Sequence, residues 1–330
     1  MVMTRENASE RNLVLDAIRV TESAAIASAR TMGRGDVPAS EAAAIDAMRM
    51  AFNSLEISGV VVIGEGAQEE APQLFVGERV GRWEGDDPRI EVALDPLESS
   101  RMCALGQPNA LSVLAMTRRG HFFNAPDIYM DKIAVGPSGS GAIDIEQSPT
   151  WNLQSVADAK GVYVQDLTVV VLDRPRHELL IREIREAGAR IKLIPDGDVS
   201  AAIATCREET GIDMLMGTGG APEGVLAAAA LQCVGGDMVG RLKPRNSEEV
   251  ERVRRSGIED PQALLGLSDL VSGEILFSAT GITDGDFLDG VRFRRGGALT
   301  YSCVMRSMTR TVRFIEAHHR FDQRPNFGVL

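Results

Sequence analysis

The sequence predicts an α/β fold, and three observations indicate it. Residues 60–63 and 167–172 are apolar, β-branched runs of strand length. Helical patterns, with apolar residues three and four positions apart, lie between such runs. Each predicted strand leads into a polar turn with glycine or proline, as in alternating α/β chains. The chain of 330 residues is also 44% hydrophobic and 25% charged, which is typical of a folded globular protein.

The first two predicted elements along the chain are helices. Residues 9–31 place apolar side chains at helical spacing, and Ser9 is the predicted N-cap. The glycines within residues 33–36 end this helix, and a second helix is predicted from about Ser40 to Met50. Glu41 would then lie in the first turn of the second helix, where the helix dipole favours a negative charge.

Five predicted strands end beside an acid or a base. The strand of residues 57–63 leads to Glu65, and that of residues 89–94 is stopped by Pro96, with Asp95 and Glu98 just past its end. The strands of residues 167–172, 191–194 and 214–216 lead to polar loops, and helices are predicted at 177–187 and 225–233. Any one such turn is also typical of a solvated loop. Five in succession favour one crevice at a rim where strand ends meet.

Composition excludes several classes of partner. A net charge of −12 argues against nucleic acid and against an anionic membrane surface. The N-terminus carries charges where a signal peptide needs an apolar core, and no run has the length of a membrane span, so we expect a cytoplasmic protein. The four cysteines are widely spaced without a CxxC pattern, which favours free thiols over zinc or disulfides. A homo-oligomer is expected for an enzyme of this size.

The acids at the strand ends indicate a metal site. Glu65, Asp95, Glu98 and Glu223 offer only oxygen ligands, which favours Mg²⁺ or Mn²⁺ over zinc. Such ions bridge carboxylates to phosphate oxygens and activate water, so the predicted chemistry is phosphoryl transfer to water. The alternative is that these acids are ordinary solvated turn residues.

Cations near the later strands indicate a phosphate site. Arg174 and Arg176 flank Pro175 in a predicted extended segment suited to binding a second phosphate, and Tyr129 and Lys132 would add contacts to oxygen. Against this, an Arg-Pro-Arg sequence is more often a solvated turn, and Tyr129 is compatible with a core position. The four histidines show no ligand spacing and are assigned no chemistry.

The chain resembles the class II, bacterial-type fructose-1,6-bisphosphatases in motifs that run in order over nearly its whole length. These motifs are TESAA (21–25), GRGD (33–36), VIGEG (62–66), EAP (70–72), DP (95–96), NALSVLA (109–115), APDIYM (125–130), KIAVGP (132–137), RPRH (174–177), PDGDV (195–199), GGAPEG (219–224) and SATGIT (278–283).

The resemblance implies the sugar-phosphatase fold shared with inositol monophosphatases, a layered α/β/α/β/α sandwich. It implies metal-dependent hydrolysis of the 1-phosphate of fructose 1,6-bisphosphate, a small-molecule substrate of carbohydrate metabolism and gluconeogenesis. It also implies metal-binding positions, catalytic positions and substrate-binding positions; these are Glu41, Glu65, Asp95, Glu98 and Glu223 for the metal, Ser100 and Glu69 for catalysis, and Ser99, Tyr129, Lys132, Arg174, Arg176, Asp196 and Asp198 for the substrate.

The departures from the family pattern cluster on the metal side. Val37 replaces a lysine, Glu41 and Glu69 replace aspartates, and Ser99 replaces a glycine that permits close approach of the backbone to phosphate. Ser100 replaces a threonine and keeps the hydroxyl. Three interpretations remain: a working fructose bisphosphatase, a phosphatase for another sugar phosphate such as sedoheptulose 1,7-bisphosphate, or a sugar-phosphate-binding paralogue without hydrolysis.

Two domains are expected, with a boundary near residue 150 in the polar segment 147–150. Residues 1–150 would form a metal-binding α/β domain, and residues 151–330 a substrate-binding α/β domain. The strand-rich part from about residue 276 to 317 is expected in the second domain.

Overall fold

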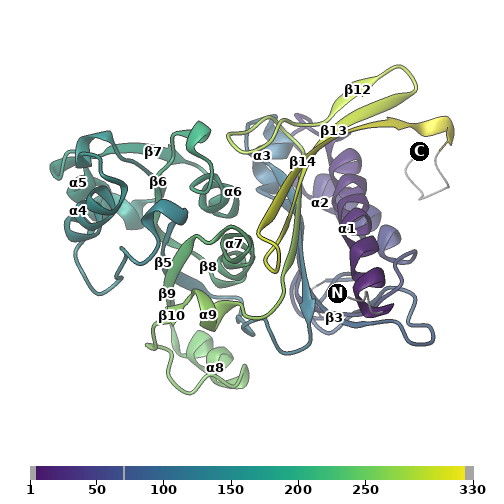
Figure 1. Cartoon of the computed structure of the whole chain (residues 1–330), viewed down its shortest axis with the longest axis horizontal. Helices are drawn as coiled ribbons and strands as arrows, with labels where there is room; N and C mark the ends of the chain where they lie inside the picture. Colours follow the sequence, from purple (N-terminus) through teal and green to yellow (C-terminus); the bar gives the residue numbers. More distant parts are fainter. Residues whose placement is uncertain (1–4, 70, 324–330) are drawn as a thin grey trace. The chain divides into compact units, whose positions relative to one another are not determined.

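A computed structural model describes residues 5–69 and 71–323, which divide into two compact units. Unit 1 comprises Met1–Gly120 and Glu274–Leu330, and unit 2 comprises His121–Gly273. Each unit contains one mixed sheet covered by helices (Figure 1), which confirms the predicted α/β class. The boundaries between the units lie after Gly120 and after Gly273, and not near residue 150 as expected. The second boundary arises because the strands after Glu274 pair with the first sheet.

The first sheet has the strand order β12-β13-β11-β4-β3-β1-β2, with β14 paired to β13. Its elements are α1 (Arg5–Ala29), α2 (Val37–Phe52), β1 (Ser58–Ile63), β2 (Arg79–Val80), β3 (Arg89–Glu98), α3 (Ser100–Leu105), β4 (Leu111–Arg118), β11 (Leu276–Gly281), β12 (Arg292–Arg294), β13 (Gly297–Arg306), β14 (Thr311–Arg320) and a 3₁₀ turn (Phe321–Gln323). The C-terminal strands therefore belong to unit 1, and their predicted place in the second domain is wrong.

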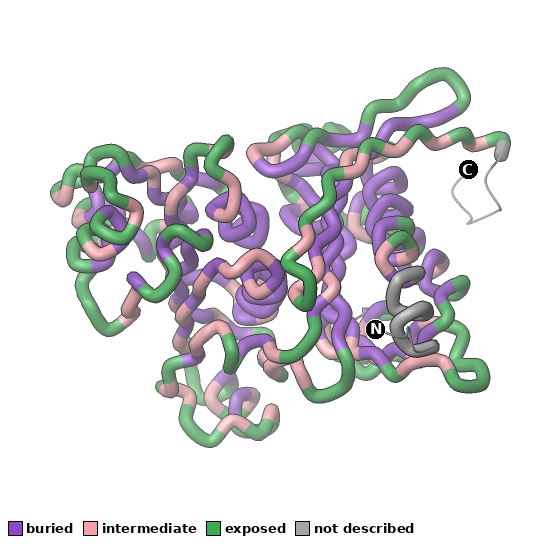
Figure 2. The backbone as a smooth tube through the Cα atoms, viewed as in Figure 1, coloured by how far each residue is buried: buried purple, intermediate pink, exposed green. Residues whose placement is uncertain are grey.

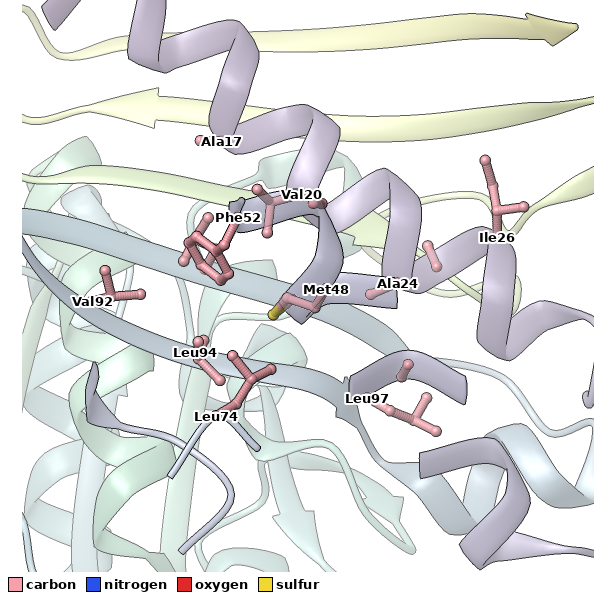
Figure 3. Close-up of a cluster of buried hydrophobic side chains, with 14 of the residues drawn as sticks. Ala17, Val20, Ala24, Ile26, Met48, Phe52, Leu74, Val92, Leu94 and Leu97 are labelled. Carbon is pink, nitrogen blue, oxygen red and sulfur yellow. The ribbon is translucent and has the colours of Figure 1, made fainter. Parts of the chain in front are cut away.

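Helices α1 and α2 pack on one face of this sheet. Small side chains such as Ala17 and Ala24 let α1 approach closely, and Met48 and Phe52 of α2 fill the space above Val92 of β3, as Figure 3 shows. All five side chains are fully or almost fully buried. Burying apolar surface stabilises a folded protein by about 25 cal/mol per Å². This cluster therefore contributes strongly to the stability of unit 1.

The starts of both helices differ from expectation. Helix α1 already includes Arg5, so Ser9 is inside the helix and is not its N-cap. Helix α2 begins at Val37, with Asp36 as N-cap, because the Asp36 carboxylate accepts the N–H of Ala39 at 3.0 Å. Glu41 consequently lies beyond the first turn of α2, which contains no acid.

The second sheet has the strand order β10-β9-β5-β8-β6-β7. Its elements are β5 (Tyr129–Val135), α4 (Pro149–Lys160), β6 (Thr168–Leu172), α5 (Glu178–Glu186), β7 (Arg190–Ile194), α6 (Asp198–Ala204), β8 (Met214–Gly220), α7 (Ala221–Val234), β9 (Asp237–Lys243), α8 (Ser247–Arg255), β10 (Leu265–Gly266) and α9 (Leu267–Leu270), with 3₁₀ turns at Pro137–Gly139, Val164–Asp166, Pro175–His177 and Glu208–Thr210.

Helices cover both faces of the second sheet. In Figure 1, α4 and α5 lie on one side of strands β5 to β8, and α6 and α7 lie on the other. The central strands of each sheet are largely buried, whereas β7, β12 and β14, many connecting loops and the β12–β13 turn of unit 1 are mostly half-buried or exposed (Figure 2). Only β6, β7 and β8 run parallel, because β5 is antiparallel to both β8 and β9.

No helix within residues 5–69 and 71–323 combines the length and the apolar character of a membrane span. The four cysteines are free thiols, as predicted, and Cys206 is the one of them that is not fully buried.

Candidate active site

Glu65 follows β1 and Asp95 lies within β3, at the same level of two neighbouring parallel strands of unit 1. Ile63 of β1 pairs with Ala93 of β3, and each acid lies two residues beyond its strand's member of that pair. Parallel strands carry equivalent positions to the same end of the sheet, so the two carboxylates lie at one edge. The structure therefore brings together two of the acids predicted as metal ligands.

Close packing at Gly64 fixes the position of the Glu65 backbone. A Cβ atom at Gly64 would lie 2.1 Å from the carbonyl oxygen of Leu74, so no other residue fits there without movement. The N–H of Glu65 donates to the same carbonyl oxygen at 3.0 Å. The loop after β1 is thus held against the backbone of Leu74 at the base of the carboxylate.

Glu41 lies close enough to Glu65 for the negative charge of Glu41 to act on the Glu65 carboxyl group. Burial, followed by the charges of Asp95 and Glu41, raises the pKa of Glu65 to about 8. Three carboxylates are therefore close enough to oppose one another's ionisation. A cation among them would remove this repulsion, and an oxygen-only donor set fits a hard ion such as Mg²⁺ or Mn²⁺.

Within the described residues, no three histidine, cysteine, aspartate or glutamate side chains are gathered closely enough to ligate one ion. Glu98 is buried at the end of β3, and Glu223 belongs to unit 2. Glu69 is exposed in the turn after β1, and its predicted catalytic role stays a prediction.

Strand β3 does not stop at Pro96, contrary to expectation. It continues to Glu98 through a bulge, because the pairing with β4 shifts by one residue between Asp95 and Glu98. The bulge accommodates a proline, which has no N–H for the ladder. The N–H of Leu97 donates to the Asp95 carboxylate at 3.0 Å, which holds this side chain at the bulge.

Ser99 has a left-handed backbone conformation, which glycine adopts more readily than serine. Its φ of 67° and ψ of 50° lie in the left-handed region, which costs a residue with a Cβ atom about 1–2 kcal/mol. Its buried hydroxyl has no hydrogen-bond partner in the described part of the chain. Ser100 follows as the first residue of α3 and is half-buried.

In unit 2, the guanidinium groups of two arginines lie over the ring of Tyr129. The central carbon of the Arg176 guanidinium lies 4.8 Å from the centre of the Tyr129 ring, and that of Arg245 lies 4.5 Å from it. Both distances are those of cation–π contacts. Tyr129 and Arg176, which the sequence predicts as a substrate site, are therefore brought together.

Arg176 and His177 both bind the main chain of Thr218. Arg176 donates from Nε and Nη2 to the Thr218 carbonyl oxygen at 3.2 and 2.8 Å. The Thr218 N–H donates to Nε2 of His177 at 2.8 Å, and His177 Nδ1 lies 2.7 Å from the carbonyl oxygen of Leu172. His177 is therefore the neutral tautomer with its proton on Nδ1. Burial, first of all, lowers the pKa of His177 and favours this uncharged form.

Lys132 and Asp198 form a buried ion pair beneath the end of β8. The Lys132 ammonium lies 2.6 Å from the Asp198 carboxylate and donates to the carbonyl oxygen of Gly220 at 3.0 Å. A Cβ atom at Gly219 would lie 2.0 Å from the Asp198 carboxylate, and one at Gly220 would lie 1.8 Å from that of Glu223. Two glycines thus allow three predicted site residues, Lys132, Asp198 and Glu223, to lie against one stretch of backbone.

The remaining predicted residues make local contacts. Nη1 of Arg174 donates to the carbonyl oxygen of Asp173 at 3.1 Å, and Asp196 accepts the N–H of Gly197 at 3.1 Å. The Arg174–Arg176 segment is not extended as expected, because Pro175–His177 forms a 3₁₀ turn. This turn separates the two arginines and leaves Arg176, rather than Arg174, on the Tyr129 ring.

Sequence reasoning missed His177, Thr218 and Arg245. The signal for Arg245 was present, since Lys243-Pro244-Arg245 repeats the cation-proline-cation pattern of residues 174–176 at the end of another strand. The signal for His177 was absent, because its partner Thr218 is 41 residues away.

Neighbouring carboxylates with oxygen-only donors, and arginines able to bind phosphate, are typical of metal-dependent phosphoric monoester hydrolases. Residues 11–319 match the family model described as bacterial fructose-1,6-bisphosphatase, glpX-encoded. The chain belongs to this family, which is metal-dependent.

Two relatives from Synechococcus support membership of this family. A protein of Synechococcus elongatus named D-fructose 1,6-bisphosphatase class 2/sedoheptulose 1,7-bisphosphatase is 44% identical to this chain over 337 aligned positions, which cover 95% of this chain and 97% of the relative. A protein of the same name from Synechococcus sp. (strain JA-3-3Ab) is 45% identical over 336 positions, with the same coverage.

Proposed function

We propose that this protein hydrolyses the 1-phosphate of fructose 1,6-bisphosphate with Mg²⁺ or Mn²⁺. The observation that carries the proposal is the register of β1 and β3, which sets Glu65 and Asp95 together at one edge of the sheet. Family membership over residues 11–319 supports the substrate class.

The residues proposed to hold the metal are Glu41, Glu65, Asp95, Glu98 and Glu223. When bound, a hard divalent ion supplies an activated water and neutralises charge on phosphate oxygens. In this proposal the Ser100 hydroxyl orients the attacking water, and the exposed carboxylate of Glu69 accepts its proton. Four of these five proposed ligands belong to unit 1.

Unit 2 would bind the sugar phosphate. Tyr129, Arg174 and Arg176 offer a hydroxyl and two guanidinium groups, and Asp196 and Ser99 are proposed to contact the sugar and the scissile phosphate. Lys132 and Asp198 are proposed to act through their buried pair, which supports the backbone at Gly220. The proposed setting is the cytoplasm.

Sedoheptulose 1,7-bisphosphate is the second candidate substrate, because the names of both relatives include it. A third candidate is a sugar-phosphate-binding paralogue without hydrolysis. The left-handed Ser99 with its buried hydroxyl is the observation that favours this last alternative, because it alters the segment next to Ser100.

The test is phosphate release by the purified chain from fructose 1,6-bisphosphate, sedoheptulose 1,7-bisphosphate and the corresponding monophosphates. Release would be followed by phosphorus NMR, which distinguishes loss of the 1-phosphate from loss of the 6-phosphate. Fructose 6-phosphate as the product supports the proposal. Turnover of the seven-carbon sugar alone would favour the second candidate, and binding without turnover of any sugar would favour the third.

A further inference from the structure

Glu78 lies in the segment that follows Glu65, and its backbone is anchored on β1. The carbonyl oxygen of Glu78 accepts the N–H of Val61 at 3.0 Å, and the N–H of Gly77 donates to the carbonyl oxygen of Val61 at 2.8 Å. The chain thus leaves the end of β1 at Gly64 and returns to the middle of the same strand at Glu78. The Glu78 side chain is only 13% exposed, so its carboxylate depends on partners from the protein.

Two partners satisfy the Glu78 carboxylate, and they come from different segments. One oxygen accepts Nε of Arg49 on α2, and the other accepts the backbone N–H of Leu74. Hydrogen bonds to a charged group are roughly twice as strong as those between neutral groups. Glu78 therefore joins the helix that carries Glu41 to the loop that carries Glu65.

Leu74 connects Glu78 to Glu65 through its main chain. Its N–H is held by Glu78, and its carbonyl oxygen accepts the N–H of Glu65 at 3.0 Å. Leu74 is fully buried, and its φ of 56° lies in the left-handed region, which costs such a residue about 1–3 kcal/mol. A strained conformation of this kind persists only where surrounding contacts hold it, and the Glu78 carboxylate supplies one of them.

We propose that Glu78 and Arg49 are positioning residues, which hold Glu41 and Glu65 together for one metal ion. This inference rests on the proposed function, in which both acids bind the metal. Like charges repel, and movement of α2 away from the loop after β1 would relieve the repulsion between Glu41 and Glu65. The pair of Arg49 with Glu78 opposes that movement. The ion then finds its ligands already in place, and less of its binding free energy is lost in ordering them.

Asp87 offers a matched control in the same unit. Its carboxylate also accepts a backbone N–H, that of Glu84 at 3.0 Å, and also faces an arginine, Arg82, at 3.7 Å. Its side chain is 10% exposed, which is close to the value for Glu78. Asp87 precedes β3, whereas Asp95 lies near the other end of that strand. Asp87→Asn therefore removes a similar interaction away from the proposed metal ligands.

The test measures Mn²⁺ binding by electron paramagnetic resonance, in which the signal of free Mn²⁺ falls as the ion binds. Glu78→Gln keeps the shape of the side chain and removes its charge. We expect it to raise the Kd for Mn²⁺ by about tenfold or more, as for other residues that orient metal ligands, and Asp87→Asn to keep the Kd within about twofold of the wild type. Arg49→Gln leaves Leu74 bonded to Glu78 and should raise the Kd by a smaller factor.

A metal titration of hydrolysis separates positioning from a loss of folded protein. Glu78→Gln should need about tenfold more Mn²⁺ for half-maximal phosphate release from fructose 1,6-bisphosphate, with kcat near the wild-type value at saturating metal, because every proposed ligand is still present. Loss of folded protein alone would lower the rate at saturating metal and leave the half-maximal concentration unchanged.

An unchanged Kd in Glu78→Gln, or an equal rise in Asp87→Asn, would overturn the positioning role. If Glu78→Gln does not fold, an unchanged Kd in Arg49→Gln would overturn it instead. Absence of Mn²⁺ binding by the wild type would also overturn it. If the wild type binds Mn²⁺ and Glu78→Gln weakens that binding, but no sugar phosphate is hydrolysed, the positioning role stands and the proposed function fails.

Discussion

His177 accepts the backbone N–H of Thr218 at 2.8 Å, and the preceding residue, Arg176, donates to the carbonyl oxygen of Thr218. Two consecutive side chains of the β6–α5 turn therefore hold both polar groups of one residue on β8. Gly217 makes this possible, since a Cβ atom there would lie 3.0 Å from His177 Nε2. The arginine proposed to bind phosphate is positioned by this connection between the two segments.

Replacement of His177 should destabilise unit 2. In His177→Leu, the N–H of Thr218 and the carbonyl oxygen of Leu172 each lose a buried partner. We expect the free energy of unfolding to fall by roughly 2–4 kcal/mol, measured by urea denaturation. A decrease below about 0.5 kcal/mol would contradict the connection.

The same variant gives a pH prediction. The pKa of His177 is lowered in the folded chain, so below about pH 6.5 the unfolded chain binds the proton first and the folded chain loses stability as pH falls. The difference in stability between wild type and His177→Leu should therefore be largest near neutral pH and should shrink at lower pH, by at most about 1.4 kcal/mol per unit. A constant difference between pH 7 and pH 5 would show that folding does not lower the pKa of His177.

Ser99→Gly should stabilise the protein. Glycine adopts the left-handed φ of 67° freely and removes a buried hydroxyl that has no partner in the described chain. We expect a gain of about 1 kcal/mol, reduced by the greater freedom of glycine in the unfolded chain. Ser99→Ala is the control, because it removes the hydroxyl and keeps the backbone strain. Equal effects of the two changes would assign the cost to the hydroxyl alone.

The family departures lead to a prediction about activity. Ser99→Gly combined with Val37→Lys restores the residues usual in the family, on the two segments that begin α3 and α2. If the departures slow hydrolysis through displacement of about 1 Å near the reacting centre, the double variant should raise kcat/KM by up to about a hundredfold. Unchanged kcat/KM would mean that this chain compensates for both departures.

Lys132→Met should be strongly destabilising. It would leave the Asp198 carboxylate buried without its ion-pair partner, which typically costs about 3–5 kcal/mol. Adding Asp198→Asn should recover a large part of that loss, because the stranded charge is gone. Thermal unfolding of the single and double variants would check this, and a double variant no more stable than Lys132→Met would argue against the pair.

The sequence located most strands and helices but not their partners. The β-branched runs at residues 60–63 and 168–172 became β1 and β6, because such side chains pack well in buried strands whatever their neighbours. Pro96 was read as a strand end, yet pairing with β4 through a bulge carries β3 past it. The expected position of the C-terminal strands failed for the same reason, since the pairing of β11 with β4 depends on contacts between distant segments.

The candidate site was predictable where an acid lies at or just beyond the predicted end of a strand, as at Glu65 and Asp95. The residues that hold the candidate site in place were harder to predict. The ion pair of Lys132 with Asp198 and the stacking of Arg245 on Tyr129 each join segments more than one element apart, and no local pattern indicates such pairs.

The most direct test of the metal site is phosphate release from fructose 1,6-bisphosphate by wild type, Glu65→Gln and the exposed control Glu84→Gln, each titrated with Mg²⁺ or Mn²⁺ after removal of metal by chelator. We expect metal-dependent release by the wild type and by Glu84→Gln, and a rate at least about a hundredfold lower for Glu65→Gln. Release by Glu65→Gln at the wild-type rate, or release by the wild type in chelator, would contradict a metal held by the carboxylates at the ends of β1 and β3.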